Sequence, residues 1–252
     1  MVKNITGTNG NDNLRGNTWD SNRIQGLNGN DTLRGGFSTD TLYGGDGNDL
    51  LFAIGGVGNN LFGDDGSDTL YGSDYRDTLD GGSGGDRLEG KEGDDFLKGK
   101  DGKDSLWGGQ GRDILQGGND EDLLDGDSGN DLIYGDTHND TLFGDSGNDL
   151  LVGGSGNDFL NGSNGKDTLV GGSGSDRFYL DHRSSEYDII KDFSSIDSFR
   201  FATRGYAYNM RSGSNAYIYE DSFANPGTSN LVAVVENTTA GLMESQGLES
   251  LG

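Results

Sequence analysis

A strict nine-residue repeat of aspartate is the feature that most constrains the fold of this chain. An aspartate stands at every ninth position from Asp68 to Asp176 without interruption. Each lies in a version of G-G-x-G-x-D-x-L-x, as in residues 44–52 and 153–161. So short and regular a period predicts a solenoid, in which each repeat packs only on its neighbours.

The same period continues upstream of Asp68 with small slips, which gives about nineteen repeats. The Asp position is assigned there to Asp12, Asn22, Asp31, Asp40, Asp49 and Asn60. Two residues after each such position comes one large apolar side chain, usually Leu, with Phe62 following Asn60. A triplet of this kind between glycine-rich segments predicts a very short strand with only its middle side chain inward.

The glycine-rich segment before each aspartate predicts a turn, because glycine reaches the backbone conformations that let carbonyl groups point to one spot. Calcium prefers such sites, which mix carboxylates with carbonyl oxygens. Two repeats form one flattened coil, so alternate loops stack on two edges. The first edge takes the loops of Asp12, Asp31, Asp49, Asp68, Asp86, Asp104, Asp122, Asp140, Asp158 and Asp176, and the second those of Asn22, Asp40, Asn60, Asp77, Asp95, Asp113, Asp131, Asp149 and Asp167.

The nonapeptide resembles the calcium-binding repeat of the RTX (repeats-in-toxin) family over roughly residues 7 to 180. The resemblance implies an all-β fold, a right-handed parallel β-roll (β-solenoid) with a C-terminal β-rich cap. It also implies about ten to seventeen bound Ca²⁺ ions. The metal ligands expected are Asp12, Asp31, Asp40, Asp49, Asp68, Asp77, Asp86, Asp95, Asp104, Asp113, Asp131, Asp149, Asp158, Asp167 and Asp176, with Asp122 and Asp140 as weaker candidates.

Some loops depart from the pattern, and we expect these to bind calcium poorly. The glycine two residues before the Asp position is replaced by Asp20, Ser38 and Tyr75 in the N-terminal half of the second edge. On the first edge Asp120 and His138 replace it, which predicts a gap near His138. Calcium is expected to be coupled to folding, since stacked carboxylates repel by about 1 kcal/mol per pair in water.

Composition restricts the location and the partners of the chain. The formal charge is −25, and such acidity argues against nucleic acid and anionic membrane surfaces as partners. The sequence has no cysteine, no apolar run long enough to span a membrane, and no apolar core of a cleavable signal peptide near Met1. Extracellular modules bind calcium at roughly 0.1 to 1 mM, so the repeat predicts a secreted or cell-surface protein.

The composition changes near residue 180, which divides the chain into a calcium-binding roll (1–180) and a C-terminal segment (181–252). The alternating segments Ala216–Tyr219 and Leu231–Val235 predict antiparallel strands of a cap that covers the open end of the solenoid. In the RTX family this region also carries an uncleaved signal for a type I exporter, for which residues 237–252 are the expected place.

Outward positions beside the inward leucines form an apolar ladder on one face, made of Phe96, Ile114, Leu132, Tyr134, Leu150, Val152 and Val170. This ladder, or an open first coil, predicts contact with the tail, a partner or a second copy in a homo-oligomer or filament.

Three classes of function remain. We favour a non-enzymatic, secreted calcium-binding β-roll with a cell-surface, matrix or self-assembling structural role. The alternative is the export and folding module of an RTX toxin or secreted hydrolase whose effector domain is absent from this chain. An enzyme built on the roll is the weakest, because calcium binding explains all the regularly spaced carboxylates.

Overall fold

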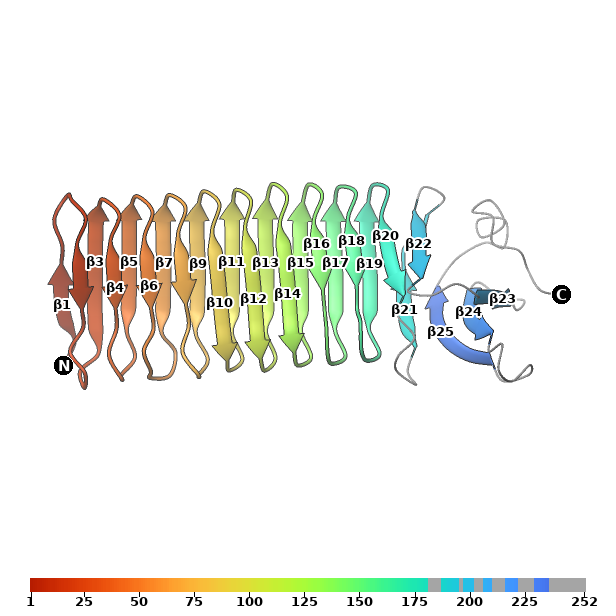
Figure 1. Ribbon diagram of the computed structural model, residues 1–252, viewed down its shortest axis with the longest axis horizontal. Coiled ribbons are helices and arrows are strands. Elements are labelled where there is room, and N and C mark those ends of the chain that lie inside the picture. The colour runs from red at the N-terminus through yellow and green to blue at the C-terminus, as the bar shows by residue number, and fades with distance from the viewer. Residues whose placement is uncertain (181–186, 195–196, 202–205, 210–215, 222–228, 236–252) are drawn as a thin grey trace.

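The computed structural model shows a long solenoid built from two parallel β-sheets that face each other (Figure 1). It describes residues 1–180, 187–194, 197–201, 206–209, 216–221 and 229–235. None of these residues is helical, and hence none forms a helix long and apolar enough to cross a membrane. The all-β fold and the parallel β-roll predicted from the repeat are confirmed.

Alternate strands along the chain belong to alternate sheets. One sheet has the order β1 (Lys3–Thr6), β3 (Asn22–Asn28), β5 (Thr41–Asp46), β7 (Asn60–Asp65), β9 (Thr78–Ser83), β11 (Phe96–Asp101), β13 (Ile114–Asn119), β15 (Leu132–Thr137), β17 (Leu150–Ser155), β19 (Thr168–Ser173), β21 (Asp188–Lys191), β25 (Ser229–Val235), β24 (Ala216–Asp221) and β23 (Tyr206–Asn209). The other has the order β2 (Asn13–Arg15), β4 (Thr32–Arg34), β6 (Leu50–Phe52), β8 (Thr69–Tyr71), β10 (Arg87–Glu92), β12 (Ser105–Gln110), β14 (Leu123–Ser128), β16 (Thr141–Phe143), β18 (Phe159–Asn161), β20 (Arg177–Leu180) and β22 (Ser198–Phe201).

The core is a double column of leucine side chains between the sheets. Leu97 pairs with Leu79 and Leu115 in the first sheet, and the equivalent leucines of the second sheet also stack in register. These side chains are completely buried. One buried Leu contributes about 2 to 3 kcal/mol, so the columns favour the stack along its whole length.

Most strands in the middle of the roll are longer than the triplet predicted from sequence. β11, for example, continues from Phe96 to Asp101 and includes the first glycine of the next loop, Gly99, which is buried. The backbone of this glycine-rich stretch pairs with the neighbouring coil, as where Lys100 lies opposite Gly118. The loops are therefore built into the sheets, and the two edges are lines of stacked turns.

One repeat was assigned out of register by a single residue. Asn59, and not Asn60, occupies the Asp position and is fully buried, and Leu61, rather than Phe62, points into the core. Side chains alternate across a strand, so a slip of one residue exchanges the inward and outward positions. Phe62 instead lies on the outer face, where it stacks on Tyr43. With this register, Val57 takes the place of the loop glycine.

Parallel stacking continues past the last nonapeptide. β21 pairs in parallel with β19, and β22 with β20. β25 then pairs in parallel with β21, and β24 pairs in antiparallel fashion with β25 and β23. The antiparallel strands predicted at the C-terminal end are confirmed. The segment expected to hold an export signal, 237–252, lies outside the described residues.

Candidate metal centres

The Asp-position residues of the repeat form two ladders, one along each edge of the roll, and Asn22 and Asn59 take the place of aspartate on the second edge. Figure 1 shows the two edges as lines of stacked turns. The Oδ1 atom of such a residue accepts a hydrogen bond from the backbone N–H of the Asp-position residue one coil earlier. Asp95 N donates to Asp113 Oδ1 at 2.7 Å, and Asp104 N donates to Asp122 Oδ1 at 2.8 Å. The same bond recurs along both edges, so the alternation of loops between two edges is confirmed.

The second carboxylate oxygen, Oδ2, is left for another ligand. In most repeats this atom is buried and accepts no hydrogen bond from any residue that the structure describes. Such an atom is expensive to bury, because its desolvation is not offset by a partner. The aspartates with this unpaired Oδ2 include Asp31, Asp49, Asp68, Asp86, Asp95, Asp104, Asp113, Asp122, Asp131, Asp140, Asp149, Asp158 and Asp176.

Backbone carbonyl oxygens converge on the same place. A Cβ atom added to Gly108, the first residue of the Asp113 loop, would lie 2.6 Å from Oδ2 of Asp113 and 2.9 Å from the carbonyl oxygen of Gly126. Gly90 has the same relation to Asp95 and to the carbonyl of Gly108. Glycine is required here because any side chain would fill the space between these oxygens.

The loops from Asp31 onward on the first edge, and from Asp95 onward on the second, hold this geometry through two left-handed residues, at their second and fourth positions. In the Asp49 loop these are Gly45 and Gly47, with φ of 107° and 129°. Asp120 and His138 adopt φ of 75° and 78°, so they follow the backbone path of the glycines they replace. The loops of Asp122 and Asp140 thus have the same shape as their neighbours, and a calcium gap near His138 stays a prediction without geometric support.

Burial and mutual repulsion make these carboxylates reluctant to ionise. Burial raises the pKa of Asp95, Asp104 and Asp149 to about 8, and that of Asp68 to about 7. The hydrogen bond from the preceding coil lowers each pKa, and neighbouring carboxylates of the same ladder raise it further. A cation between consecutive loops would remove this penalty, because it supplies the missing positive charge.

The donor set fits calcium. The ladders offer carboxylate and carbonyl oxygens only, and a hard cation such as Ca²⁺ takes six to eight oxygen ligands of these kinds. Ions shared by successive loops would link the coils along each edge. In the described loops the one imidazole is that of His138, and its Nδ1 accepts a hydrogen bond from Asp120 N, so the arrangement does not favour the softer metals that prefer nitrogen or sulfur.

Three of the aspartates predicted as ligands stand apart, because their Oδ2 atoms already accept hydrogen bonds. Oδ2 of Asp12 accepts from the backbone N–H and the hydroxyl of Thr8. Oδ2 of Asp40 accepts from Gly36 N, and Oδ2 of Asp77 accepts from the N–H and hydroxyl of Ser73. The two Asn residues in the Asp position, Asn22 and Asn59, lie on the same edge as Asp40 and Asp77.

The ladders also include two residues that sequence reasoning missed. Asp167 N donates to Asp188 Oδ1 at 3.2 Å, and Asp176 N donates to Asp197 Oδ1 at 2.9 Å. The spacing there rises from 18 to 21 residues, which hid them from a search at fixed period. The signal that could have found them is the apolar residue two positions later, which is the buried Ile190 in the case of Asp188.

This fold and these ladders define a class of protein, the metal-binding β-solenoid with loops that supply only oxygen ligands. Comparison with protein families makes the assignment specific: the chain belongs to the RTX calcium-binding nonapeptide repeat family. The family model matches more than half of the chain, at residues 17–51, 62–97, 80–115, 89–124, 116–151 and 144–178. Comparison with curated proteins gives no match.

Proposed function

We propose that this protein is a secreted, non-enzymatic β-roll that binds calcium along both edges and folds when it meets calcium outside the cell. The observation that carries the proposal is the row of buried Oδ2 atoms, which leaves half of each carboxylate for a cation. The ion-binding residues proposed on this basis are Asp31, Asp49, Asp68, Asp86, Asp95, Asp104, Asp113, Asp122, Asp131, Asp140, Asp149, Asp158 and Asp176. Asp167 is proposed from its place in the same ladder, between Asp149 and Asp188.

Folding outside the cell follows from the charge. Without cations the roll must either bury ionised carboxylates or keep them protonated near neutral pH, and both oppose folding. Extracellular calcium at about 1 mM suits sites of this kind, whereas cytosolic calcium does not. Export through a type I system accords with this sequence of events and with the family assignment.

A structural or self-assembling role is the biological setting we propose. The predicted apolar ladder lies on the outer face of one sheet, where Phe96, Ile114, Leu132 and Leu150 occupy equivalent positions on β11, β13, β15 and β17. Most ladder members are half-buried by their own neighbours, and Ile114 is the most exposed at 37 %. A flat apolar row on a rigid face suits lateral contact with a second copy.

The second candidate is a module that folds on calcium and thereby assists export of an effector domain. The observation that favours it lies in the first sheet, where β21 is followed by β25, β24 and β23 at the C-terminal end, whereas β1 pairs only with β3 among the described strands. A terminal strand of this kind can pair with another domain as readily as with a second copy.

Far-UV circular dichroism combined with sedimentation velocity tests both candidates in one calcium titration, from excess chelator to 10 mM. A cooperative transition from coil to β-structure at millimolar calcium, accompanied by growing assemblies, is the result expected for a self-assembling protein. The same transition with a persistent monomer would favour the module. A β-signal that is unchanged in chelator at neutral pH would defeat calcium-coupled folding itself.

A further inference from the structure

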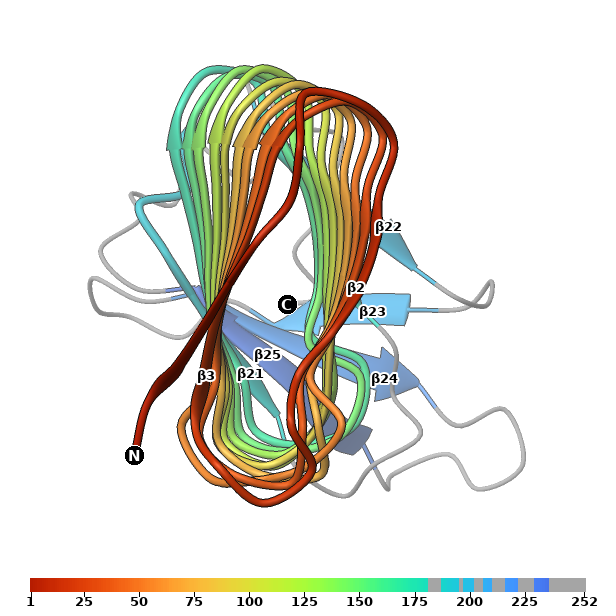
Figure 2. The ribbon, with the colours of Figure 1, turned by 90° about the vertical axis from the view of Figure 1, so that its left-hand side faces the viewer.

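The four N-terminal loops of the second edge, residues 16–22, 35–40, 53–59 and 72–77, depart from the calcium-type loops. They end at Asn22, Asp40, Asn59 and Asp77. Three of them contain no left-handed residue, and the fourth has its left-handed residues, Gly56 and Gly58, at shifted positions. In Figure 2 the second edge lies at the bottom, where the red and orange coils follow a different path from the green ones. These four loops are called the seam below.

In the middle of the seam, the side-chain amide of Asn59 fills the space that a cation would take. Its Nδ2 donates to the carbonyl oxygen of Gly55 at 3.0 Å and to Oδ1 of Asp77 at 2.8 Å. Its Oδ1 meanwhile accepts from Asp40 N at 2.9 Å, as an aspartate would. Asn59 is completely buried, so these bonds are not exchanged with water.

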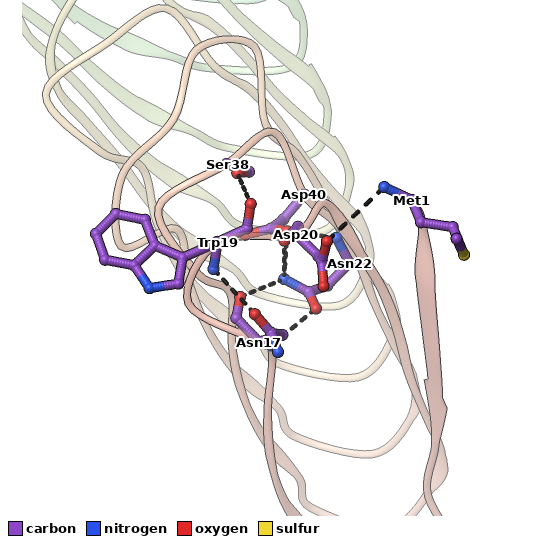
Figure 3. Close-up of polar contacts among 7 residues, drawn as sticks. All are labelled: Met1, Asn17, Trp19, Asp20, Asn22, Ser38 and Asp40. Carbon is purple, nitrogen blue, oxygen red and sulfur yellow. Dashed lines mark hydrogen bonds and ion pairs between the residues drawn. The ribbon is translucent and has the colours of Figure 1, made fainter.

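Asn22 repeats the arrangement two coils earlier (Figure 3). Its Nδ2 donates to the carbonyl oxygens of Asn17 at 3.0 Å and Asp20 at 2.8 Å, and to Oδ1 of Asp40 at 2.7 Å. Two loop carbonyls and the carboxylate of the next coil therefore point at one nitrogen. This is the type of oxygen set that surrounds a calcium ion, but here a neutral N–H donor stands at its centre.

The two carboxylates at the Asp position of the seam are also satisfied within the chain. Oδ2 of Asp40 accepts from Gly36 N at 2.5 Å. Oδ2 of Asp77 accepts from Ser73 N at 2.6 Å and from Ser73 Oγ at 2.8 Å. Neither atom belongs to the unpaired Oδ2 atoms of the described residues. Ser73 is itself buried and is thereby fixed in place as a donor.

Charge spacing agrees with this arrangement. Neutral Asn and charged Asp alternate at the Asp position along the seam, so the carboxylates at this position lie two coils apart, at about 10 Å, instead of about 5 Å. Coulomb repulsion falls with distance, and at 10 Å between groups near the surface it is small. From Asp77 onward every coil of this edge carries an aspartate, and the repulsion between neighbours returns.

We propose that the seam binds no calcium. The amides of Asn22 and Asn59 and the hydroxyl of Ser73 donate hydrogen bonds to the carboxylates that a calcium ion would otherwise stabilise. The calcium ladder of the second edge begins at Asp95, while the first edge carries ions past the seam from Asp31 onward. The N-terminal half of the roll is thus held by ions on one edge and by hydrogen bonds on the other. This inference rests on the proposed calcium binding of the remaining loops.

Native mass spectrometry of the calcium-loaded full chain tests the proposal with a matched pair of variants, Asp77→Asn and Asp131→Asn. Both remove one negative charge from the same edge and keep an oxygen for the ladder hydrogen bond. We expect Asp131→Asn to lose one bound ion and Asp77→Asn to lose none. Circular dichroism in millimolar calcium checks that both variants are folded.

The other outcomes distinguish failure of the metal-free seam from failure of calcium binding by the remaining loops. Loss of one ion from both variants would overturn the metal-free seam while leaving calcium binding intact. Loss from neither would overturn the calcium ladder, and with it the premise of the seam. Loss from Asp77→Asn alone would overturn both the seam and the assignment of the later loops.

A spectroscopic test needs no change in the ladders, because the two tryptophans of the chain lie in the two regions. Trp19 is in the seam, and Trp107 directly precedes the calcium-type loop of Asp113. Tb³⁺ takes the same oxygen ligands as calcium and emits when a nearby indole is excited. Trp19→Phe should keep the sensitised emission, and Trp107→Phe should lose most of it. Emission that depends chiefly on Trp19 would overturn the proposal.

Discussion

The two halves of the second edge differ in how they stabilise the buried carboxylates at the ends of their loops. From Asp95 to Asp149, each loop ends in a buried carboxylate with an oxygen that no described residue pairs. From Asn22 to Asp77, the Oδ2 atoms of Asp40 and Asp77 accept hydrogen bonds from backbone N–H groups and the Ser73 hydroxyl. The side-chain amides of Asn22 and Asn59 donate to the Oδ1 atoms of the same two aspartates. The same leucine column runs through both halves, so the core does not dictate which solution is used. What differs is whether residues of the loop itself supply the hydrogen-bond donors for these oxygens.

The two solutions also differ in what the loop tips can carry. Calcium-type loops need glycine or another left-handed residue at two fixed positions. The seam has no such requirement, and its tips hold large apolar side chains, with Trp19 79 % exposed and packed against Phe37. Loops that do not bind metal can therefore carry large apolar residues at positions where the calcium-type loops require glycine or another left-handed residue.

Removal of calcium should give the largest contrast between the halves. Each ion bound at a hundred times its Kd stabilises the fold by about 2.7 kcal/mol, so the loss of several ions exceeds the roughly 5 to 15 kcal/mol of an ordinary domain. We expect chelator to unfold the roll, with amide exchange rising first in residues 90–167. Hydrogen-exchange mass spectrometry over a calcium series measures the order. Simultaneous loss of protection in both halves would contradict the proposed difference between the calcium-bound and the hydrogen-bonded half of the second edge.

Acid should partly replace calcium. The pKa values of Asp95, Asp104 and Asp149 are raised to about 8 from 3.8, chiefly by burial. A group with a higher pKa in the folded state stabilises the fold when protonated, so its contribution is full below about pH 4 and is lost as the pH rises through 8. In chelator, we expect circular dichroism to show β-structure at acid pH that disappears towards pH 8.

The same pH series in millimolar calcium provides the control for that experiment. There the cation stabilises the ionised carboxylates, so β-structure should persist at neutral and mildly alkaline pH. A chelated protein whose β-signal does not change between pH 4 and 8 would show that the Oδ2 ladders do not titrate as burial requires.

A matched pair of glycine substitutions should distinguish the two kinds of loop. Gly129 belongs to the Asp131 loop with φ of 151°, and a methyl group there would overlap the carbonyl of Gly111. Gly58 in the seam has φ of 72° and nothing within 4 Å of an added Cβ. We expect Gly129→Ala to lower the unfolding free energy by more than about 3 kcal/mol and Gly58→Ala by about 1 kcal/mol. Urea titration in calcium measures both, and equal losses would contradict the difference in packing.

The smallest expected effect concerns the aromatic pair on the outer face beside the seam. Tyr43 and Phe62 stack with centroids 4.9 Å apart, and Arg23 lies over Tyr43. A double-mutant cycle with Tyr43→Ala and Phe62→Ala should give a coupling energy of about 0.5 to 1.5 kcal/mol. The coupling should change little with calcium concentration, because both rings lie on the outer face of the sheet, whereas the open Oδ2 atoms of the neighbouring loops are buried. A coupling that grows with calcium would instead link this face to the ladders.

Much of the site was readable in advance because the repeat encodes it locally. The nine-residue spacing places each Asp at the end of a glycine loop and each Leu in the core, and stacking then follows from the period alone. Prediction was less successful where spacing slipped. Asn59 was confused with the adjacent Asn60, and Asp188 and Asp197 were missed, because a fixed period carries no information about an inserted residue.

The sequence by itself determined the parallel roll, its two edges and the oxygen-only ligand set, since these depend on residue type and period. Only the tertiary structure decided the different roles of the two carboxylate oxygens. Oδ1 accepts a hydrogen bond from the preceding coil, and Oδ2 of residues such as Asp113 accepts none from a described residue. It also decided that the Ser73 hydroxyl donates a hydrogen bond to Asp77, and that the Asn59 amide donates one to Asp77 in the next coil. The Oδ1 bond of Asp113 and the bond from Asn59 join residues 18 apart in the chain, which come together only when the coils stack, whereas Ser73 and Asp77 lie four residues apart within one loop.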